Sequence, residues 1–163
     1  MTAQPETAAR DEKEKYERII KEFRQKVFIG GDFEKVAEYL TSDFVDHFAL
    51  PWEQHGREGA KKRFGQGADA FSADSIDVQL SVYEDGILIQ AITLNLEHSG
   101  EFMGVGATTK KVAIGGFDAF RFQGDKIAEH WGVYDVSKIP DLLGAEFGQS
   151  SANGGWSSMW QSS

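Results

Sequence analysis

The hydrophobic period of the chain changes once, near residue 76, and this change limits the folds that the chain can adopt. Before it, apolar residues recur at three- and four-residue steps, which predicts buried helix faces. These residues are Tyr16, Ile19, Ile20, Phe23 and Val27 in a first helix, and Phe33, Val36, Ala37 and Leu40 in a second. Gly30 and Gly31 end the first helix, and a third helix is expected to start between Gly56 and Gly59.

Strands follow the helices. Ile76, Val78, Leu80 and Val82 alternate with polar residues, which predicts a strand with one buried face. Residues 87–96, 110–122 and 127–134 are expected to form further strands, with a hairpin turn at residues 123–126. Helices first and antiparallel strands after them indicate an α+β fold, in which the helices pack on one curved antiparallel sheet.

The two ends of the chain differ in composition from the part between them. Residues 1–15 are polar and are interpreted as a flexible leader, and residues 16–144 as one domain. Residues 145–163 form a tail rich in serine and glycine, with Trp156 and Trp160 four positions apart. The tail is either an extension without fixed structure or a flap whose tryptophans cover the pocket or a partner subunit.

Charge and cysteine content exclude several function classes. The formal net charge is -9, so a phosphate backbone or an anionic membrane surface would be repelled. The chain has no cysteine, which excludes disulfides, thiolate nucleophiles and cysteine-based zinc sites. No signal peptide is recognised, and no apolar run approaches the roughly 20 residues that a membrane span needs. We therefore expect a cytoplasmic protein that binds neither nucleic acid nor membranes.

The last hairpin carries the most informative residues. If Gly124 and Asp125 form a two-residue turn, Phe122 pairs with Ile127 and Asp118 lies opposite Trp131. One face of the hairpin then carries Ile114, Asp118, Phe120, Phe122, Ile127, Glu129, Trp131, Val133 and Asp135. That face is apolar apart from its carboxylates. A slip of one residue in the turn would bring His130 onto it instead.

Asp118 and Asp135 are the leading candidates for acid–base chemistry. A carboxylate on an apolar face loses hydration, which raises its pKa and suits it to proton exchange near neutral pH. Two structural alternatives remain open. Asp118 could be a buried acid held by a neighbouring residue, and Asp135 could cap a helix that starts at Val136.

Histidines are the next candidates. His47 follows an aromatic and acidic segment, and His98 continues the face of Leu94 and Leu96, so either imidazole could move a proton or orient a carbonyl. His55 is expected in a solvent-exposed loop. No close pair of histidines has metal-ligand spacing, and no phosphate-binding loop, dinucleotide-binding glycine motif or serine nucleophile elbow is found. We therefore expect chemistry without metal or cofactor.

Several of these stretches, in this order and spacing, resemble the SnoaL-like polyketide cyclase and ester cyclase family of the nuclear transport factor 2-like superfamily. Residues 31–33 and 44–47 are similar to its "GD…fvdH" opening, and residues 98–104 to its "H-x-G-e-f-x-G" loop. Residues 117–135 are similar to its ending "D-x-f-r-f…G-k-I-x-E-h-W…D", and residues 142–144 match its terminus. The resemblance covers about Tyr16 to Gly144.

The resemblance implies a cone formed by a curved antiparallel sheet and three N-terminal helices, usually in a homodimer. Family members include polyketide cyclases that close a ring by intramolecular aldol condensation without metal or cofactor. The resemblance assigns the acid–base aspartate to Asp135 and pocket histidines to His47 and His98. Residues 107–110 depart from the family's "P-T-G-k", and the tryptophan-bearing tail has no counterpart there.

The expected function is acid–base catalysis on a small apolar carbonyl compound, by ring closure of the polyketide cyclase type. The candidate catalytic residues are Asp135, Asp118, His47 and His98. The candidate substrate-binding residues are Phe23, Trp52, Phe64, Phe120 and Trp131. Isomerisation, dehydration and hydrolysis are alternatives on the same scaffold, as is a non-catalytic dimer that binds a small ligand.

Overall fold

The computed structural model describes residues 5–49 and 53–144. Its helices are α1 (Pro5–Phe23), a π-helical segment η1 (Arg24–Ile29), the short η2 (Phe33–Lys35) and α2 (Val36–Tyr39), α3 (Gly56–Ala70), η3 (Val136–Lys138) and α4 (Ile139–Leu143). Its strands are β1 (Leu40–Asp46), β2 (Phe71–Glu84), β3 (Ile87–His98), β4 (Lys111–Gln123) and β5 (Lys126–Tyr134). Helices precede most of the sheet, so the predicted α+β class is confirmed.

The five strands form one sheet in the order β1-β5-β4-β3-β2. Strands β2 to β5 pair antiparallel with their neighbours, as expected, but β1 pairs parallel with β5. The expectation of a purely antiparallel sheet was therefore wrong at one edge. No strand was predicted at β1, where Leu40 and Phe44 bury their side chains against the helices.

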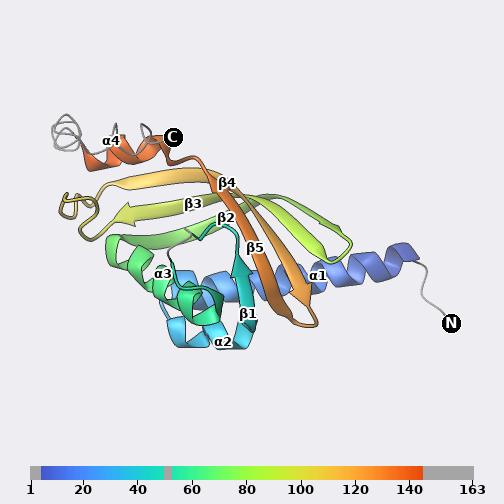
Figure 1. Cartoon of the computed structure of the whole chain (residues 1–163). Coiled ribbons are helices and arrows are strands. Elements are labelled where there is room, and N and C mark those ends of the chain that lie inside the picture. Colours follow the sequence, from blue (N-terminus) through green and yellow to red (C-terminus); the bar gives the residue numbers. More distant parts are fainter. Residues whose placement is uncertain (1–4, 50–52, 145–163) are drawn as a thin grey trace, which may run out of the picture.

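The helices α1, α2 and α3 cover the concave face of the curved sheet (Figure 1). The hydrophobic core lies between these layers. Its fully buried members include Ile20 from α1, Val27 from η1, Leu88 from β3 and Ile127 from β5. Aromatic residues of this core, such as Phe23, Phe44 and Phe120, also line a cavity.

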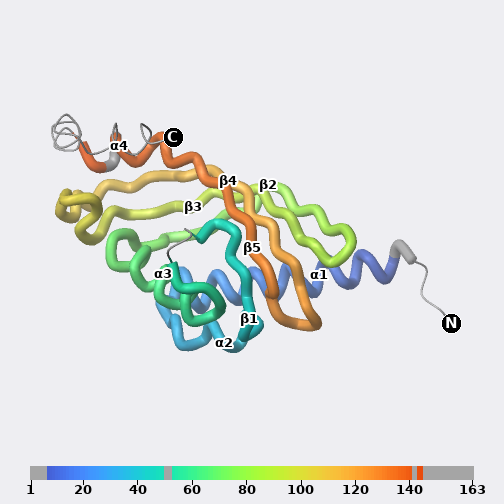
Figure 2. The backbone as a smooth tube through the Cα atoms, viewed as in Figure 1, coloured from blue at the N-terminus to red at the C-terminus, as the bar shows by residue number. Residues whose placement is uncertain are grey.

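Helix α1 begins at Pro5, so the flexible leader predicted for residues 1–15 was wrong from residue 5 onward. The charged residues that suggested a leader instead pair one turn apart, as Arg10 does with Glu14 and Lys13 with Glu17. The tube in Figure 2 shows α1 passing the two hairpin tips of the sheet. There, Glu12 accepts a hydrogen bond from Tyr83 and Lys15 pairs with Asp125.

A β-bulge in β5 sets which side chains face the helices. Phe122 pairs with Ile127, as predicted, but the next pair is Arg121 with Glu129, so Ala128 is an extra residue on β5. Beyond the bulge Asp118 lies opposite Gly132, and the predicted pairing of Asp118 with Trp131 was wrong. The extra residue reverses the faces of β5, so that His130 points inward and Trp131 outward.

Candidate active site

A cavity of about 610 Å³ opens between the sheet and the helices. Such a volume is typical of sites for small organic molecules. Aromatic side chains make up much of its wall: Phe23, Phe28, Phe33, Phe44, Phe48, Phe64, Phe71, Phe102 and Phe120. Three of the five predicted substrate-binding residues, Phe23, Phe64 and Phe120, are in this wall. Trp52 lies outside the described residues.

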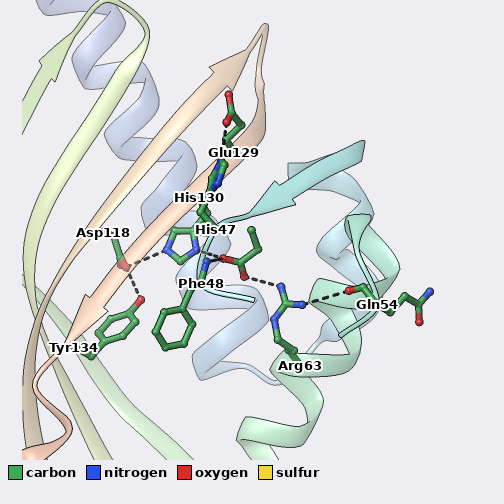
Figure 3. Close-up of polar contacts among 9 residues, drawn as sticks. His47, Phe48, Gln54, Arg63, Asp118, Glu129, His130 and Tyr134 are labelled. Atoms are coloured by element: carbon green, nitrogen blue, oxygen red, sulfur yellow. Dashed lines mark hydrogen bonds and ion pairs between the residues drawn. The ribbon is translucent and has the colours of Figure 1, made fainter. Parts of the chain in front are cut away.

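One connected polar network faces the cavity, and His130 is at its centre (Figure 3). The Nδ1 atom of His130 lies 3.0 Å from Oδ1 of Asp46, and its Nε2 atom lies 3.1 Å from Oδ1 of Asp118. A carboxylate accepts hydrogen bonds only, so this arrangement favours a ring with protons on both nitrogens. Burial lowers the pKa of His130, but the two carboxylates outweigh it and raise the pKa to about 9. The imidazole is therefore a cation at neutral pH.

An arginine closes each end of the network. At one end Arg63 of α3 donates to Oδ2 of Asp46 over 2.6 Å. At the other, Arg24 of η1 donates to Oδ2 of Asp118 over 2.9 Å and to the Gln90 side chain over 2.7 Å. The two carboxylates thus belong to strands, and the arginines that neutralise them belong to helical segments.

The pKa of Asp118 shifts in the direction opposite to the sequence-based expectation, and that of Asp46 shifts the same way. Burial alone would raise the pKa of Asp118, as predicted, yet hydrogen bonds from His130 and Tyr134 and the Arg24 charge lower it. In the same way burial raises the pKa of Asp46, and its bonds to His130, the Phe48 amide and Arg63 lower it overall. Both carboxylates are charged at neutral pH.

Tyr134 adds a hydroxyl to the network. It donates a hydrogen bond to Oδ1 of Asp118, and its ring meets that of Phe48 edge-on at 5.6 Å. Burial and the neighbouring Asp118 charge raise the pKa of the phenol, so it keeps its proton. Gly116 and Gly132 leave the space for its ring: a Cβ would lie 2.5 Å from the Tyr134 ring at Gly116 and 3.0 Å at Gly132.

Asp135 lies outside the cavity, so the prediction that it faces the pocket was wrong. Its side chain is exposed and accepts a hydrogen bond from the Ser137 amide over 3.1 Å, which lowers its pKa. It is the N-cap of η3, the structural alternative that the sequence had left open. The reversal of faces at the β5 bulge explains the error, because Asp135 follows the inward Tyr134.

His47 and Trp131 also lie outside the cavity wall. The His47 ring stacks on the Trp131 ring, with centroids 4.4 Å apart and planes 4° apart. Its Nε2 atom lies 2.9 Å from Oε2 of Glu129, which accepts a further bond from Arg121 over 2.9 Å. These four residues, His47, Arg121, Glu129 and Trp131, form what we call the outer cluster. The predictions that His47 and Trp131 line the pocket were wrong.

His98 is fully buried but is not part of the cavity wall. Its Nδ1 atom accepts a hydrogen bond from the Thr108 amide over 3.2 Å, so the proton of a neutral ring is on Nε2. That Nε2 atom has no hydrogen-bond partner among the described residues. The ring packs 5.4 Å from Phe71, which lines the cavity, so His98 supports the wall from behind.

Sequence reasoning named Asp118, and His130 only for a slipped turn, but missed four other members of the polar network: Arg24, Asp46, Arg63 and Tyr134. Arg24 could have been found, because it lies four positions after Ile20 and three before Val27 on the buried helix face. The others gave no comparable signal. Asp46 faces inward only because β1 pairs with β5, and Arg63 follows two lysines in the sequence, which is typical of a solvated helix face.

Two further findings concern metals and membranes. Among the residues that the structure describes, no three histidine or acidic side chains converge in a way that could hold a metal ion. None of the described helices combines the length and the apolar character needed to cross a bilayer.

Comparisons with known proteins agree with this fold. The chain matches TsrD from Streptomyces laurentii with a TM-score of 0.69 and 20% identity, over 80% of this chain and 96% of that one. IdmH from Streptomyces antibioticus matches with a TM-score of 0.66 and 23% identity, over 80% and 99%. A SnoaL-like polyketide cyclase from Agrobacterium tumefaciens matches with 0.63 and 15%, over 79% and 98%. These TM-scores establish a shared fold.

No curated protein matches the sequence. The family model described as SnoaL-like polyketide cyclase matches residues 18–140, which is most of the chain and contains the whole polar network. The chain therefore belongs to the SnoaL-like polyketide cyclase family.

Proposed function

We propose that the protein is an acid–base enzyme that closes a ring in a small apolar carbonyl compound by intramolecular aldol addition. The observation that carries this proposal is a polar network, with His130 between Asp46 and Asp118, in the wall of a cavity that is otherwise largely apolar. Charged groups in such a low-dielectric wall interact strongly with charge that develops on a bound substrate.

Asp118 is the proposed base. Its Oδ1 atom accepts from both His130 and Tyr134. A substrate carbonyl oxygen that takes over the Tyr134 hydroxyl would remove one of these donors and make the carboxylate more basic. Asp118 then takes a proton from the carbon next to that carbonyl, and the Tyr134 hydroxyl holds the enolate oxygen.

The enolate carbon attacks a second carbonyl carbon in the same molecule and forms the new carbon–carbon bond. The alkoxide produced takes a proton from His130, and Asp118 returns its proton to the ring, so that the enzyme ends as it began. Positioned proton transfer contributes about 10²- to 10⁴-fold. The aromatic wall supplies the rest by holding the chain of the substrate in a folded conformation.

The experiment uses α-tetralone, an apolar aryl ketone, and its derivative with a butanone side chain on the α-carbon. Exchange of the α-hydrogens in D₂O, followed by NMR, reports proton removal, and chromatography of the derivative reports ring closure. We expect exchange by the wild type to exceed the buffer rate, and Asp118→Asn and Tyr134→Phe to lose most of it. Asp135→Asn is the matched control and should exchange at the wild-type rate.

A non-catalytic ligand-binding module is the second candidate. It is favoured by one observation: Asp46, Asp118 and His130 already satisfy one another and two arginines. Calorimetry separates the two candidates. Binding of α-tetralone with exchange no faster than in buffer would overturn the enzyme proposal and support the binding module.

We also propose that the protein forms a homodimer through the outer face of its sheet. Large apolar side chains are exposed there on four adjacent strands, at Leu80, Val82, Ile89, Phe117 and Val133. An apolar face of this kind is typical of association surfaces. Sedimentation of the wild type and of Phe117→Lys tests this, since a dimer through this face should dissociate in the variant.

A further inference from the structure

The outer cluster lies directly behind the polar network, on the opposite side of the same two strands. Asp46 and His130 are aligned partners on β1 and β5 and form the inward pair. The residues next to them along the chain, His47 and Glu129, form the outward pair. Figure 3 shows the Glu129 carboxylate apart from Asp118 and Tyr134. The inward and outward pairs therefore each join β5 to the end of β1, since His47 directly follows that strand.

Strand β1 needs such support because it is weakly attached to the sheet. It is an edge strand, and its register with β5 is irregular between Leu40 and Val45. Next to the paired residues Val45 and Asp46, the His47 amide donates a further backbone hydrogen bond to the His130 carbonyl, at 2.8 Å. A short parallel pairing fixes a side chain less firmly than the long antiparallel ladder that holds Asp118 on β4.

The contacts of His47 provide a second attachment on the outer side. Its ring is stacked on Trp131 and its Nε2 atom contacts Glu129, both of which belong to β5. Arg121 of β4 holds Glu129 from the other side and lies with its guanidinium 5.9 Å from the centre of the Trp131 ring. The outer cluster thus joins β1 to both β5 and β4.

We propose that His47 and Glu129 are positioning residues, which keep Asp46 of β1 in hydrogen-bond contact with His130 on the other side of the sheet. The effect of this positioning on catalysis rests on the proposed function, whereas the positioning of Asp46 itself does not. It gives a role to the Asp-His and Glu-His-Trp segments of the sequence: one residue of each faces the cavity, and its neighbours face outward to hold it.

The test follows the two ring N–H protons of His130 by NMR, because they report the two sides of the network separately. The Nδ1 proton is bonded to Asp46 on β1, and the Nε2 proton to Asp118 on β4. In His47→Ala we expect the Nδ1 proton to exchange with solvent about tenfold faster, from the combined loss of a ring stack and a hydrogen bond. The Nε2 proton should keep its wild-type rate.

Controls separate positioning from charge and from general destabilisation. Glu129→Gln keeps the shape of the side chain but removes its charge, and should also affect the Nδ1 proton more than the Nε2 proton. Asp74→Asn breaks an exposed ion pair with Lys111 elsewhere on the sheet and should change neither proton. Equal changes at both ring nitrogens, or no change at either, would overturn the positioning role.

Activity gives the second readout. If the proposed function holds, His47→Ala should lower kcat for α-tetralone exchange about tenfold with KM nearly unchanged, since the cavity wall is intact. A wild type without exchange activity would refute the proposed function and leave the NMR result standing. Unchanged N–H exchange in the two outer variants would refute the positioning role and leave the proposed function standing.

Discussion

Tyr134 reaches Asp118 because Gly132, two residues earlier on the same strand, has no side chain. A Cβ at Gly132 would lie 3.0 Å from the Tyr134 ring and hydroxyl, and 3.1 Å from Cε1 of His130. A single methyl group at this position would therefore press on two members of the polar network. Gly132 lies in a strand and has no positive φ. Glycine is therefore required at this position for the space that it leaves, and not for its backbone conformation.

The first prediction concerns this space. Gly132→Ala should displace Tyr134 from Asp118, destabilise the protein by about 1–3 kcal/mol and lower α-tetralone exchange strongly. Urea denaturation and the NMR exchange assay measure the two effects. Gly115→Ala is the control, because a Cβ there meets nothing within 4 Å. Equal behaviour of the two alanine variants would contradict the role assigned to Gly132.

The second prediction concerns pH and stability. The pKa of His130 is raised to about 9 in the folded protein, above the 6.5 of an unperturbed histidine. The imidazolium therefore stabilises the fold fully below pH 6.5, and this contribution declines as the pH rises toward 9. Its loss is at most about 3 kcal/mol, since a tenfold change in an ionisation equilibrium corresponds to about 1.4 kcal/mol.

Urea denaturation of the wild type and of His130→Gln between pH 6 and pH 10 checks this sign. The variant should lack the decline between about pH 6.5 and 9 that the wild type shows. A wild-type stability that rises through this interval would show that His130 is neutral in the folded protein.

The third prediction concerns the buried ion pair. Arg24 and Asp118 expose only 7% and 5% of their side chains, so either charge left alone is costly. Arg24→Met should destabilise the protein by about 3–5 kcal/mol. Adding Asp118→Asn to the same chain should recover part of the loss, because the isolated charge is then gone. Thermal unfolding measures the stability of these variants. A double variant whose loss of stability equals the sum of the losses of the two single variants would contradict coupling.

The fourth prediction separates the cap from the chemistry. Asp135→Asn should preserve both stability and α-tetralone exchange, because asparagine caps a helix as well as aspartate does. Asp135→Ala should lower the Tm slightly, because the bond to the Ser137 amide is lost, and should leave exchange unchanged. A loss of exchange in a folded Asp135→Asn protein would restore Asp135 as a reacting group.

The sequence predicted the layers of the fold well, because periodic burial is a local property. The faces of the α1 helix and of the β3 and β4 strands follow directly from the spacing of their apolar residues. The buried face predicted for β2 was wrong, because Val78, Leu80 and Val82 are exposed; the strand register shifts between Val78 and Leu80. Phe23, Phe64 and Phe120 were assigned to the pocket correctly on this basis. The helical residues before Tyr16 were missed because their stability comes from charged side chains and not from a buried face.

The site was predicted less well, because one residue decides it. Ala128 is the unpaired residue of the bulge, and nothing in its type distinguishes it from a regular strand residue. Strand pairs counted from the turn without this bulge assigned Trp131 and Asp135 to the cavity and His130 to the outer face. The parallel pairing of β1 was also invisible, since partners so far apart in sequence leave no periodic signal; Asp46 was missed for that reason.

The two arginines of the network belong to helical segments, whereas the two carboxylates belong to strands. Moving the helices away from the sheet would leave an unpaired charge on each layer in an apolar interior, which is costly. The two ion pairs therefore hold the helices and the sheet together. The distance between the two layers at this end of the cavity is therefore fixed by the fold itself.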